Sequence, residues 1–370
     1  MRKFLLFLFT IVLMNSCNVN SNGDKINVGL LLPLTGAWSN SGEQMATGAQ
    51  LWEQNNPNSK LNLIYEDSKS SAKYGISAFS KMLNVNNIDV CITGVTPVIF
   101  GISPMIDESG VFTMNVGAIN PKIKELSNNL FCVIPDAEVE GEYISNYMIH
   151  NLNRKTCSVL WKNDDSGRGI FDSFKSSYAK SAGTIISDFA VENDTEMKSI
   201  LLNIYNSNVR TIFIATNGEN VARIIRQAYS LGLTDILWVS FAAAESPELL
   251  ETLSALQCTN FIMSSYSFNN MNVTPKTAQF VESYKYKFNK MPQVYAASCY
   301  DALSLINMAV EKGDCKTAKE IREYVISLQS YDGASGCFEI SNKNYVSAGM
   351  SFSMFSEGKI LPIDDNLFRE

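Results

Sequence analysis

The chain has 370 residues, of which 46% are hydrophobic, 11% aromatic and 18% charged, which excludes a disordered protein and a single small domain. Its 30 Lys and Arg against 37 Asp and Glu give a net charge of −7, and no basic stretch alternates with aromatic residues, so no nucleic-acid partner is expected. The single histidine, His150, argues against a Ser-His-Asp triad and against a His-rich metal site, and no cofactor is expected.

The N-terminal segment has the pattern of a secretion signal. Two basic residues precede the apolar run 4–14, which is too short to span a bilayer. The run leads into Leu-Met-Asn-Ser before Cys17, which resembles the lipobox of bacterial lipoproteins. We therefore expect 1–16 to be a lipoprotein signal peptide, Cys17 to carry the lipid and 17–25 to be a tether. The alternative is a plain cleaved signal with Cys17 as an incidental thiol. Either interpretation places the protein outside the cytoplasm.

Seven cysteines follow Cys17, an odd number that cannot all pair. None is spaced as CxxC, which argues against zinc and thioredoxin-type redox sites. Cys91 and Cys157 lie in runs typical of buried strands, where a thiol behaves as a small hydrophobe. Cys315 and Cys337 flank one predicted helix and could form a disulfide, but free thiols are the favoured interpretation because sequence alone does not give the separation of their Cα atoms.

From residue 26 onward, short aliphatic runs alternate with segments of helical periodicity, the pattern that builds parallel βαβ sheets. A helix is expected to begin near Ser41, because Ser41-x-x-Gln44 has the form of a capping box. The strands of this first series are predicted at 26–32, 61–66, 90–93 and 111–114. Together these elements predict one doubly wound lobe.

A second series begins near Gly141 and repeats this architecture. Its strands are predicted at 157–161, 184–189, 211–215, 236–240 and 260–264, with helices at 197–205, 220–231 and 247–256. Beyond residue 274 the pattern becomes helical, and a glycine-rich hairpin is expected within 331–355. Two similar α/β lobes would place a ligand cleft between them, at the carboxyl ends of both sets of strands.

Six motifs occur in order along nearly the whole mature chain. They are VGLLLPLTG at 28–36 with the following Gly42 and Gly48, DESGVF at 107–112, GAINP at 117–121, RQAYSLGL at 226–233, PQVYAASCYDAL at 292–303 and YDGASG at 331–336. In this order they resemble the bacterial leucine/isoleucine/valine-binding family, the type I periplasmic binding proteins that serve ABC importers. Each motif alone would be a weak signal, whereas six in order are specific for the fold.

The resemblance implies an α/β fold of two doubly wound parallel-sheet lobes joined by three hinge crossings. We place the crossings near 133–136, 264–267 and 340–347. Lobe 1 would then comprise 26–134 plus 267–340, and lobe 2 would comprise 135–266 plus 347–370. A ligand in the cleft would favour closure of the hinge, and no chemistry on the ligand is expected, so the protein is not expected to be an enzyme.

The resemblance also implies which residues face the ligand. In amino-acid-binding members, the loops after the third and fourth strands supply hydroxyl and backbone N–H groups to the ligand carboxylate. Here these loops contribute Thr96 and the run Gly117, Ala118 and Ile119, with Ile119 at the position of the family's threonine. The family's ammonium-binding carboxylate corresponds to Ala242, and its aromatic cleft positions correspond to Ser41, Ser166 and Asn217.

These substitutions disfavour leucine, isoleucine and valine as ligands. An unpaired buried ammonium is costly, so a zwitterion would need a substitute acid such as Asp164, Asp165 or Glu245. Asp164 and Asp165 have an alternative interpretation as a solvated turn, and Glu245 as a helix-terminal charge.

Three further positions carry two interpretations each. Thr96 precedes Pro97 at a helix start, so it is either an N-cap or a ligand donor. Trp38 on the first cleft loop either stacks on the ligand or packs on its own lobe. Arg168 either meets an anion or forms an exposed salt bridge.

The expected function is that of an extracytoplasmic, lipid-anchored solute-binding protein. It would capture a small polar molecule and deliver it to an ABC permease, as a monomer held at the cell membrane or the outer membrane. The alternative is a sensory or scaffold protein whose closure is detected by a signalling partner. An enzyme on this scaffold lacks an identifiable nucleophile and base.

Overall fold

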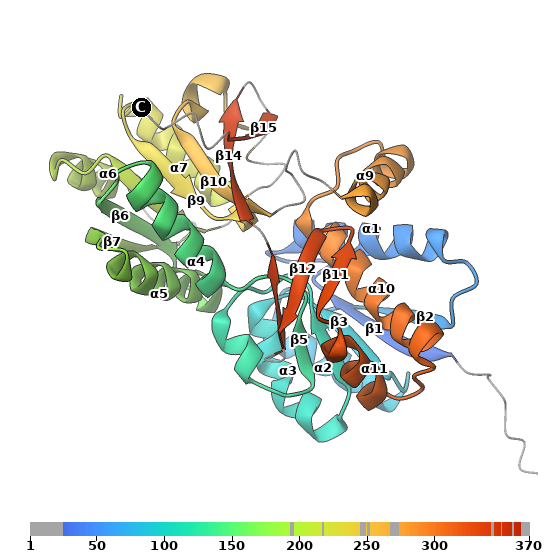
Figure 1. The fold of residues 1–370 in the computed structure, drawn as a ribbon. Helices are drawn as coiled ribbons and strands as arrows, with labels where there is room; N and C mark the ends of the chain where they lie inside the picture. The colour runs from blue at the N-terminus through green and yellow to red at the C-terminus, as the bar shows by residue number, and fades with distance from the viewer. Residues whose placement is uncertain are drawn as a thin grey trace, which may run out of the picture.

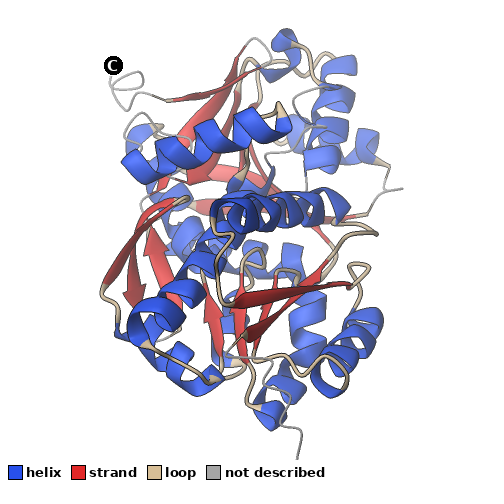
Figure 2. Ribbon diagram, turned by 90° about the vertical axis from the view of Figure 1, so that its right-hand side faces the viewer, coloured by secondary structure: helices blue, strands red, loops and turns tan. Residues whose placement is uncertain are grey.

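The computed structural model describes residues 25–363, apart from 193–195, 217, 245–248, 250–251, 267–273, 342–343, 349 and 357–358. The described residues form two α/β lobes, each built on its own sheet (Figure 1). Helices flank the strands of both sheets (Figure 2). The fold class predicted from the sequence, two doubly wound lobes dominated by parallel strands, is confirmed.

The sheet of lobe 1 has eight strands in the order β11-β12-β13-β5-β4-β3-β1-β2. Its parallel part consists of β1 (Ile26–Leu32), β2 (Leu61–Asp67), β3 (Val90–Thr93), β4 (Phe112–Asn115) and β5 (Leu130–Cys132). β1, β3, β4 and β5 are almost entirely buried, as expected of strands covered on both faces. The antiparallel extension consists of β11 (Ser330–Gly333), β12 (Gly336–Ser341) and β13 (Tyr345–Ala348).

Helices cover this sheet on both sides. They are α1 (Ser39–Asn55), α2 (Ala72–Asn84), α3 (Thr96–Ser109), the short η1 (Pro121–Glu125), α9 (Pro275–Phe288), α10 (Val294–Gly313) and α11 (Ala318–Ser327). The α1 helix begins two residues earlier than predicted, with Trp38 at the N-cap position. The predicted capping box at Ser41 is therefore wrong, because Ser41 already lies inside the first turn.

The sheet of lobe 2 has seven strands in the order β15-β14-β10-β9-β8-β6-β7. They are β6 (Thr156–Lys162), β7 (Thr184–Val191), β8 (Thr211–Ala215), β9 (Leu237–Ser240), β10 (Phe261–Tyr266), β14 (Met350–Ser356) and β15 (Lys359–Pro362). Its helical elements are α4 (Ala137–Asn146), η2 (Tyr147–Asn151), α5 (Asp165–Lys180), α6 (Met197–Asn206), α7 (Gly218–Ser230), η3 (Ala242–Ala244) and η4 (Ala255–Cys258). Of the predicted helix at 247–256, residues 247–248 and 250–251 lie outside the described part, Leu249 and Thr252 are helical, and the last two residues belong to η4.

The described strands show where the chain passes from one sheet to the other. The first passage follows β5 at 133–136, as predicted, and the second leads from β10 towards α9. The third does not lie within 340–347, because Ile340 pairs with Val346 and Tyr345 pairs with Cys132, all inside the lobe 1 sheet. It lies between β13 and β14 instead, so lobe 2 cannot resume at residue 347. The other lobe limits remain our proposal.

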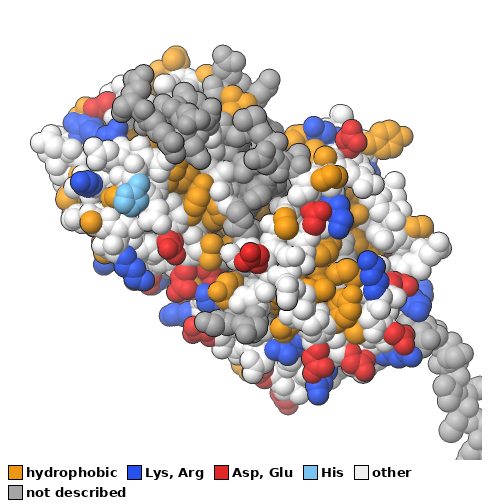
Figure 3. Space-filling view, viewed as in Figure 1, with side chains coloured by type: hydrophobic (Ala, Val, Ile, Leu, Met, Phe, Trp, Pro, Cys, Tyr) orange, Lys and Arg blue, Asp and Glu red, His pale blue; other side chains and the backbone are white. Residues whose placement is uncertain are grey.

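The cysteines of the described chain are free thiols. Cys91 and Cys157 are buried in β3 and β6, where the sequence predicted strands. Cys315 is buried and Cys337 is exposed, and they are not joined. None of the described helices has both the length and the apolar character needed to cross a bilayer. Acidic and basic side chains are interspersed on the face shown in Figure 3.

Candidate functional site: the cleft between the lobes

A cavity lies where the loops at the carboxyl ends of both parallel sheets meet, the place predicted for a ligand. Lobe 1 contributes loop residues after β1, β3 and β4, and lobe 2 contributes the start of α5 and the loop after β9. The lining residues are Trp38, Gly94, Val95, Thr96, Gly117, Ala118, Ile119, Ser166, Ile170, Phe241 and Tyr295.

Most of the predicted ligand residues line this cavity. Trp38, Thr96, Gly117, Ala118, Ile119 and Ser166 are among the lining residues. Ser41 forms a hydrogen bond with the hydroxyl of Tyr295, which itself lines the cavity. Ala242 directly follows Phe241, and Asn217 lies outside the described residues.

The cavity is small and mostly apolar. It measures about 340 Å³ when the part open to solvent is included. The rings of Trp38, Phe241 and Tyr295 supply much of the wall, and Thr96 and Ser166 add hydroxyl groups, the composition typical of a small-molecule site. A solute held here would contact both lobes.

Two glycines let the loops after β3 and β4 approach each other at the cavity. A Cβ atom at Gly117 would lie 2.8 Å from the carbonyl oxygen of Gly94, and one at Gly94 would lie 3.1 Å from the amide nitrogen of Gly117. Both Cβ atoms would also clash with the end of the Met45 side chain. Glycine is therefore required at Gly117, whereas a side chain at Gly94 would have to displace the end of Met45 and shift the facing backbone slightly.

Backbone N–H groups of the loop after β4 are already engaged. The side-chain oxygen of Asn115 accepts hydrogen bonds from the N–H groups of Gly117, at 3.2 Å, and Ala118, at 2.8 Å. The Asn115 amide also donates to the carbonyl of Ala118 at 2.6 Å. These two N–H groups are thus less available for a ligand carboxylate than the family pattern implied.

The structure decides between the interpretations of Thr96 and Trp38. Val95, not Thr96, is the N-cap of α3, so the capping interpretation of Thr96 is wrong. Trp38 packs on its own lobe, as one interpretation proposed, whereas its stacking on a ligand stays a prediction. Its side chain packs against the core beneath the lobe 1 sheet, and it also lines the cavity. Across the cleft, the Lys162 ammonium lies 5.5 Å from the centre of the Trp38 ring.

The acids proposed as partners for a ligand ammonium are placed differently. Asp164 caps α5 by accepting from the N–H of Gly167 at 2.8 Å, and it pairs with Lys162 at 3.1 Å. Asp165 is exposed, and Glu245 lies outside the described residues. Arg168 stacks on Trp161 with its guanidinium carbon 4.3 Å from the ring centre.

A buried acid that the sequence did not suggest lies beside Ala242. One carboxylate oxygen of Glu140, Oε1, accepts the N–H of Ala242 at 2.6 Å and the hydroxyl of Ser264. The side chain is 2% exposed, and burial raises the pKa of its carboxyl to about 7 against the lowering effect of these two hydrogen bonds. In the sequence Glu140 was inconspicuous, because acids are common in the first turns of helices.

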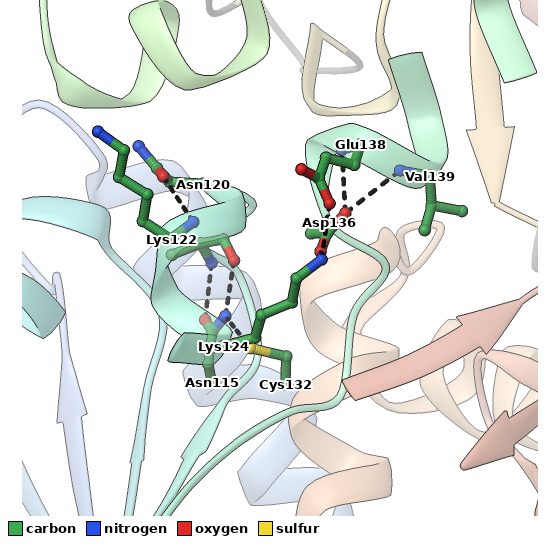
Figure 4. A network of polar contacts seen from close by, with 9 residues as sticks. Asn115, Asn120, Lys122, Lys124, Cys132, Asp136, Glu138 and Val139 are labelled. Atoms are coloured by element: carbon green, nitrogen blue, oxygen red, sulfur yellow. Dashed lines mark hydrogen bonds and ion pairs between the residues drawn. The ribbon is translucent and has the colours of Figure 1, made fainter. Parts of the chain in front are cut away.

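Polar contacts also join the lobes close to the first crossing (Figure 4). The ammonium of Lys124, on η1 of lobe 1, pairs with Asp136 at 2.6 Å and with Glu138 at 2.8 Å, both at the start of α4 in lobe 2. Burial opposes the charge of Lys124, but the hydrogen bonds to the two carboxylates outweigh it and raise its pKa. The side-chain amide of Asn120 in lobe 1 donates to the carbonyl of Asp165 in lobe 2 at 2.8 Å.

Within the described residues, no three His, Cys, Asp or Glu side chains gather as the ligands of a metal ion would. The functional features of the described chain are therefore a cavity between two lobes, direct contacts between the lobes, and one buried acid bonded to the residue after Phe241.

Comparisons with known proteins agree with this architecture. Residues 25–356 match the model of a family described as periplasmic binding protein. A Leu/Ile/Val-binding protein homolog 3 from Brucella melitensis is 19% identical over 350 residues, which cover 92% of this chain and 94% of that protein. The Leu/Ile/Val-binding protein BraC3 from Rhizobium johnstonii is 24% identical over 215 residues, or 56% of this chain and 58% of the relative.

Solved structures share the fold. The leucine-binding protein LivK from Thermotoga maritima has a TM-score of 0.84 and 21% identity, covering 92% of this chain and 98% of that one. The solute-binding protein of an ABC transporter from Rhodopseudomonas palustris BisB5, in complex with 3,4-dihydroxybenzoic acid, has a TM-score of 0.82 and 16% identity, covering 92% and 96%. The chain therefore belongs to the periplasmic binding protein family, of the type I, Leu/Ile/Val-binding kind that its six motifs predicted, and it is a solute-binding protein and not an enzyme.

Proposed function

We propose that the protein captures a small solute in the cavity between its lobes and delivers it to an ABC importer. The observation that carries this proposal is the cavity itself, because residues from both lobes wall it. A solute bound to both walls stabilises the closed arrangement, and a permease that contacts both lobes can distinguish the closed from the open form. The Rhodopseudomonas palustris relative, a solute-binding protein of an ABC transporter, supports the importer role.

We propose the predicted cleft residues as the ligand contacts. They are Trp38, Ser41, Thr96, Gly117, Ala118, Ile119, Ser166, Asn217 and Ala242. The ring of Phe241 and the side chain of Ile119 favour a solute with an apolar or aromatic body and few polar groups. Relatives from Rhodopseudomonas palustris were solved with benzoate and with 3,4-dihydroxybenzoic acid, which have such a body. Leucine, isoleucine and valine are disfavoured, because Ile119 and Ala242 lack the polar groups that a zwitterion needs.

A screen of the mature protein by thermal unfolding tests the proposal. Amino acids, amides, short peptides, sugars, nucleosides and aromatic acids are each added in excess. The true solute should raise the unfolding free energy by about 2.7 kcal/mol at a hundredfold excess over its Kd. Ser166→Trp, which fills the cavity from α5, should abolish that gain, whereas Ser176→Trp on the exposed side of the same helix should not. If no class of solute shifts the transition, or if Ser166→Trp leaves the gain intact, the cavity is not the binding site.

We further propose that a lipid on Cys17 holds the protein at a membrane outside the cytoplasm. The support is the lipobox-like sequence before Cys17. In cells, Cys17→Ala should move the protein from the membrane fraction to the soluble fraction, while Cys337→Ala, at an exposed thiol, should leave it in place. Unchanged partitioning of Cys17→Ala would contradict a lipid anchor.

A further inference from the structure

We propose that Glu140 is the ligand-binding carboxylate of the cleft, and that the solute carries a cationic nitrogen, such as a primary ammonium group, on an apolar body. The inference rests on the proposed function, since it names the chemical class of the solute that the cavity takes. In this proposal Glu140, on α4, takes the role that the sequence suggested for Asp164, Asp165 or Glu245.

The first argument is the unused oxygen of Glu140. Its Oε1 is held by the N–H of Ala242 and the hydroxyl of Ser264, which fixes the orientation of the carboxyl group. Its Oε2 is buried and has no hydrogen-bond partner among the described residues. A buried carboxylate with one free oxygen is costly, and the cost is relieved when a proton, a hydrogen-bond donor or a cation reaches that oxygen.

The second argument is location. Ala242 directly follows Phe241, which forms part of the cavity wall from lobe 2. The charge of Glu140 acts on Tyr295, which forms part of the wall from lobe 1, and burial together with this charge raises the pKa of the Tyr295 phenol. Glu140 is not itself a lining residue, but its carboxyl is bonded to the neighbour of one wall residue and lies within electrostatic range of another.

The third argument is charge. The groups that act on Glu140 are Asp136 on the same helix, Tyr295 on α10, and the donors Ala242 and Ser264. Asp136 is itself negative, and Lys124 is paired with Asp136 and Glu138. No Lys or Arg of the described chain forms an ion pair with Glu140. A positive charge on the solute would therefore complete this site when Glu140 is ionised.

The titration of Glu140 gives the inference a pH signature. Burial raises the pKa of its carboxyl from 4.5 to about 7, so in the empty protein the group is neutral well below that pH. Only the ionised form attracts a cation. The affinity for an amine should therefore rise with pH up to about 7 and then level off, because alkyl amines remain protonated throughout this range.

Two matched sets of probes test the inference by calorimetry at about pH 5.5 and about pH 8. One set is benzylamine, benzyl alcohol and benzoate, and the other is isopentylamine, isopentanol and isovalerate. Within a set, the amine should bind at least about tenfold more tightly than the alcohol at the higher pH and lose that advantage at the lower. Glu140→Gln should abolish the preference, and Glu142→Gln, an exposed acid on the same helix, should keep it. The wild-type pH profile provides the same test if Glu140→Gln does not fold.

The failures of the two proposals can be told apart. If alcohols or carboxylates bind as tightly as amines, if Glu140→Gln retains the preference for the amine, or if the broader screen yields a solute without a cationic nitrogen, Glu140 is not the ligand carboxylate, although the cleft still binds solutes. If neither the probes nor any screened solute binds, the solute-binding function itself is wrong.

Discussion

Replacing Asp301 with alanine should lower the unfolding free energy by about 3 kcal/mol or more. Asp301 lies on α10 and is fully buried. Its carboxylate accepts the N–H of Ala334 at 2.6 Å, the N–H of Ser335 at 2.8 Å and the hydroxyl of Ser335. Alanine would leave two backbone donors without a partner, and each buried orphan costs about 1–3 kcal/mol.

These bonds fix the turn between β11 and β12, so the loss should loosen the edge of the lobe 1 sheet. The chain at Gly333 packs tightly against this carboxyl group, because a Cβ atom at Gly333 would lie 2.6 Å from the carboxyl carbon of Asp301. Denaturant unfolding measures the change. Asp301→Asn, which retains one acceptor oxygen, should lose less, and Glu311→Ala, at an exposed site of the same helix, should change stability by under about 0.5 kcal/mol. An Asp301→Ala variant as stable as the Glu311→Ala control would refute this role of the carboxylate.

The same substitution has a defined pH dependence. Burial raises the pKa of Asp301 to about 6, against the lowering effect of its hydrogen bonds, from an ordinary value of 3.8. At a pH between these two pKa values, Asp301 is protonated in the folded chain and ionised in the unfolded chain. The stability contributed by Asp301 is therefore complete below about pH 4 and is partly lost as the pH rises through about 6. The loss on substitution to alanine should be larger at about pH 5 than at about pH 7.5.

Much of the fold was predictable because the parallel strands are short, local and almost wholly apolar. β1 was predicted at its observed bounds, and β3 likewise, because each is a buried run bounded by turn residues. β5 and β13 were missed as strands, since runs of three and four residues carry little periodicity. The third crossing was misplaced for the same reason. Only the pairing of Tyr345 with Cys132, more than two hundred residues away, shows that β13 belongs to lobe 1.

The candidate site was also only partly predictable from the sequence. Loops that follow parallel strands share one edge of a sheet, so Thr96 and the run from Gly117 to Ile119 could be brought together from the sequence alone. Glu140 could not, because its role depends on contacts with Ala242 and Ser264, which lie 102 and 124 residues further along the chain. Tyr295 falls in a motif that indicates the fold, and nothing local shows that its ring faces the cavity.

Gly169→Leu should hold the lobes apart and weaken solute binding by at least about thirtyfold. Gly169 lies on α5 of lobe 2, and the three atoms nearest to a Cβ at this position all belong to Asn120 of lobe 1, the closest at 2.7 Å. A Cβ atom there would therefore collide first with the opposite lobe. A steric cost of about 2 kcal/mol that applies only to the closed form reduces the affinity by about thirtyfold. Leucine is also a better helix former than glycine, so α5 should not be weakened.

Small-angle scattering and calorimetry with the solute found in the screen measure the effect together. The wild-type protein should contract when solute is added, whereas Gly169→Leu should stay extended and bind weakly. Ser176→Leu, on the exposed face of α5, should behave as the wild type. A double-mutant cycle locates the clash. Gly169→Ala should cause a smaller loss of affinity, and Asn120→Ala, which removes the colliding amide, should restore it. If Gly169→Leu contracts and binds as the wild type does, solute capture does not require the approach of α5 to lobe 1, and the trapping mechanism proposed above is wrong.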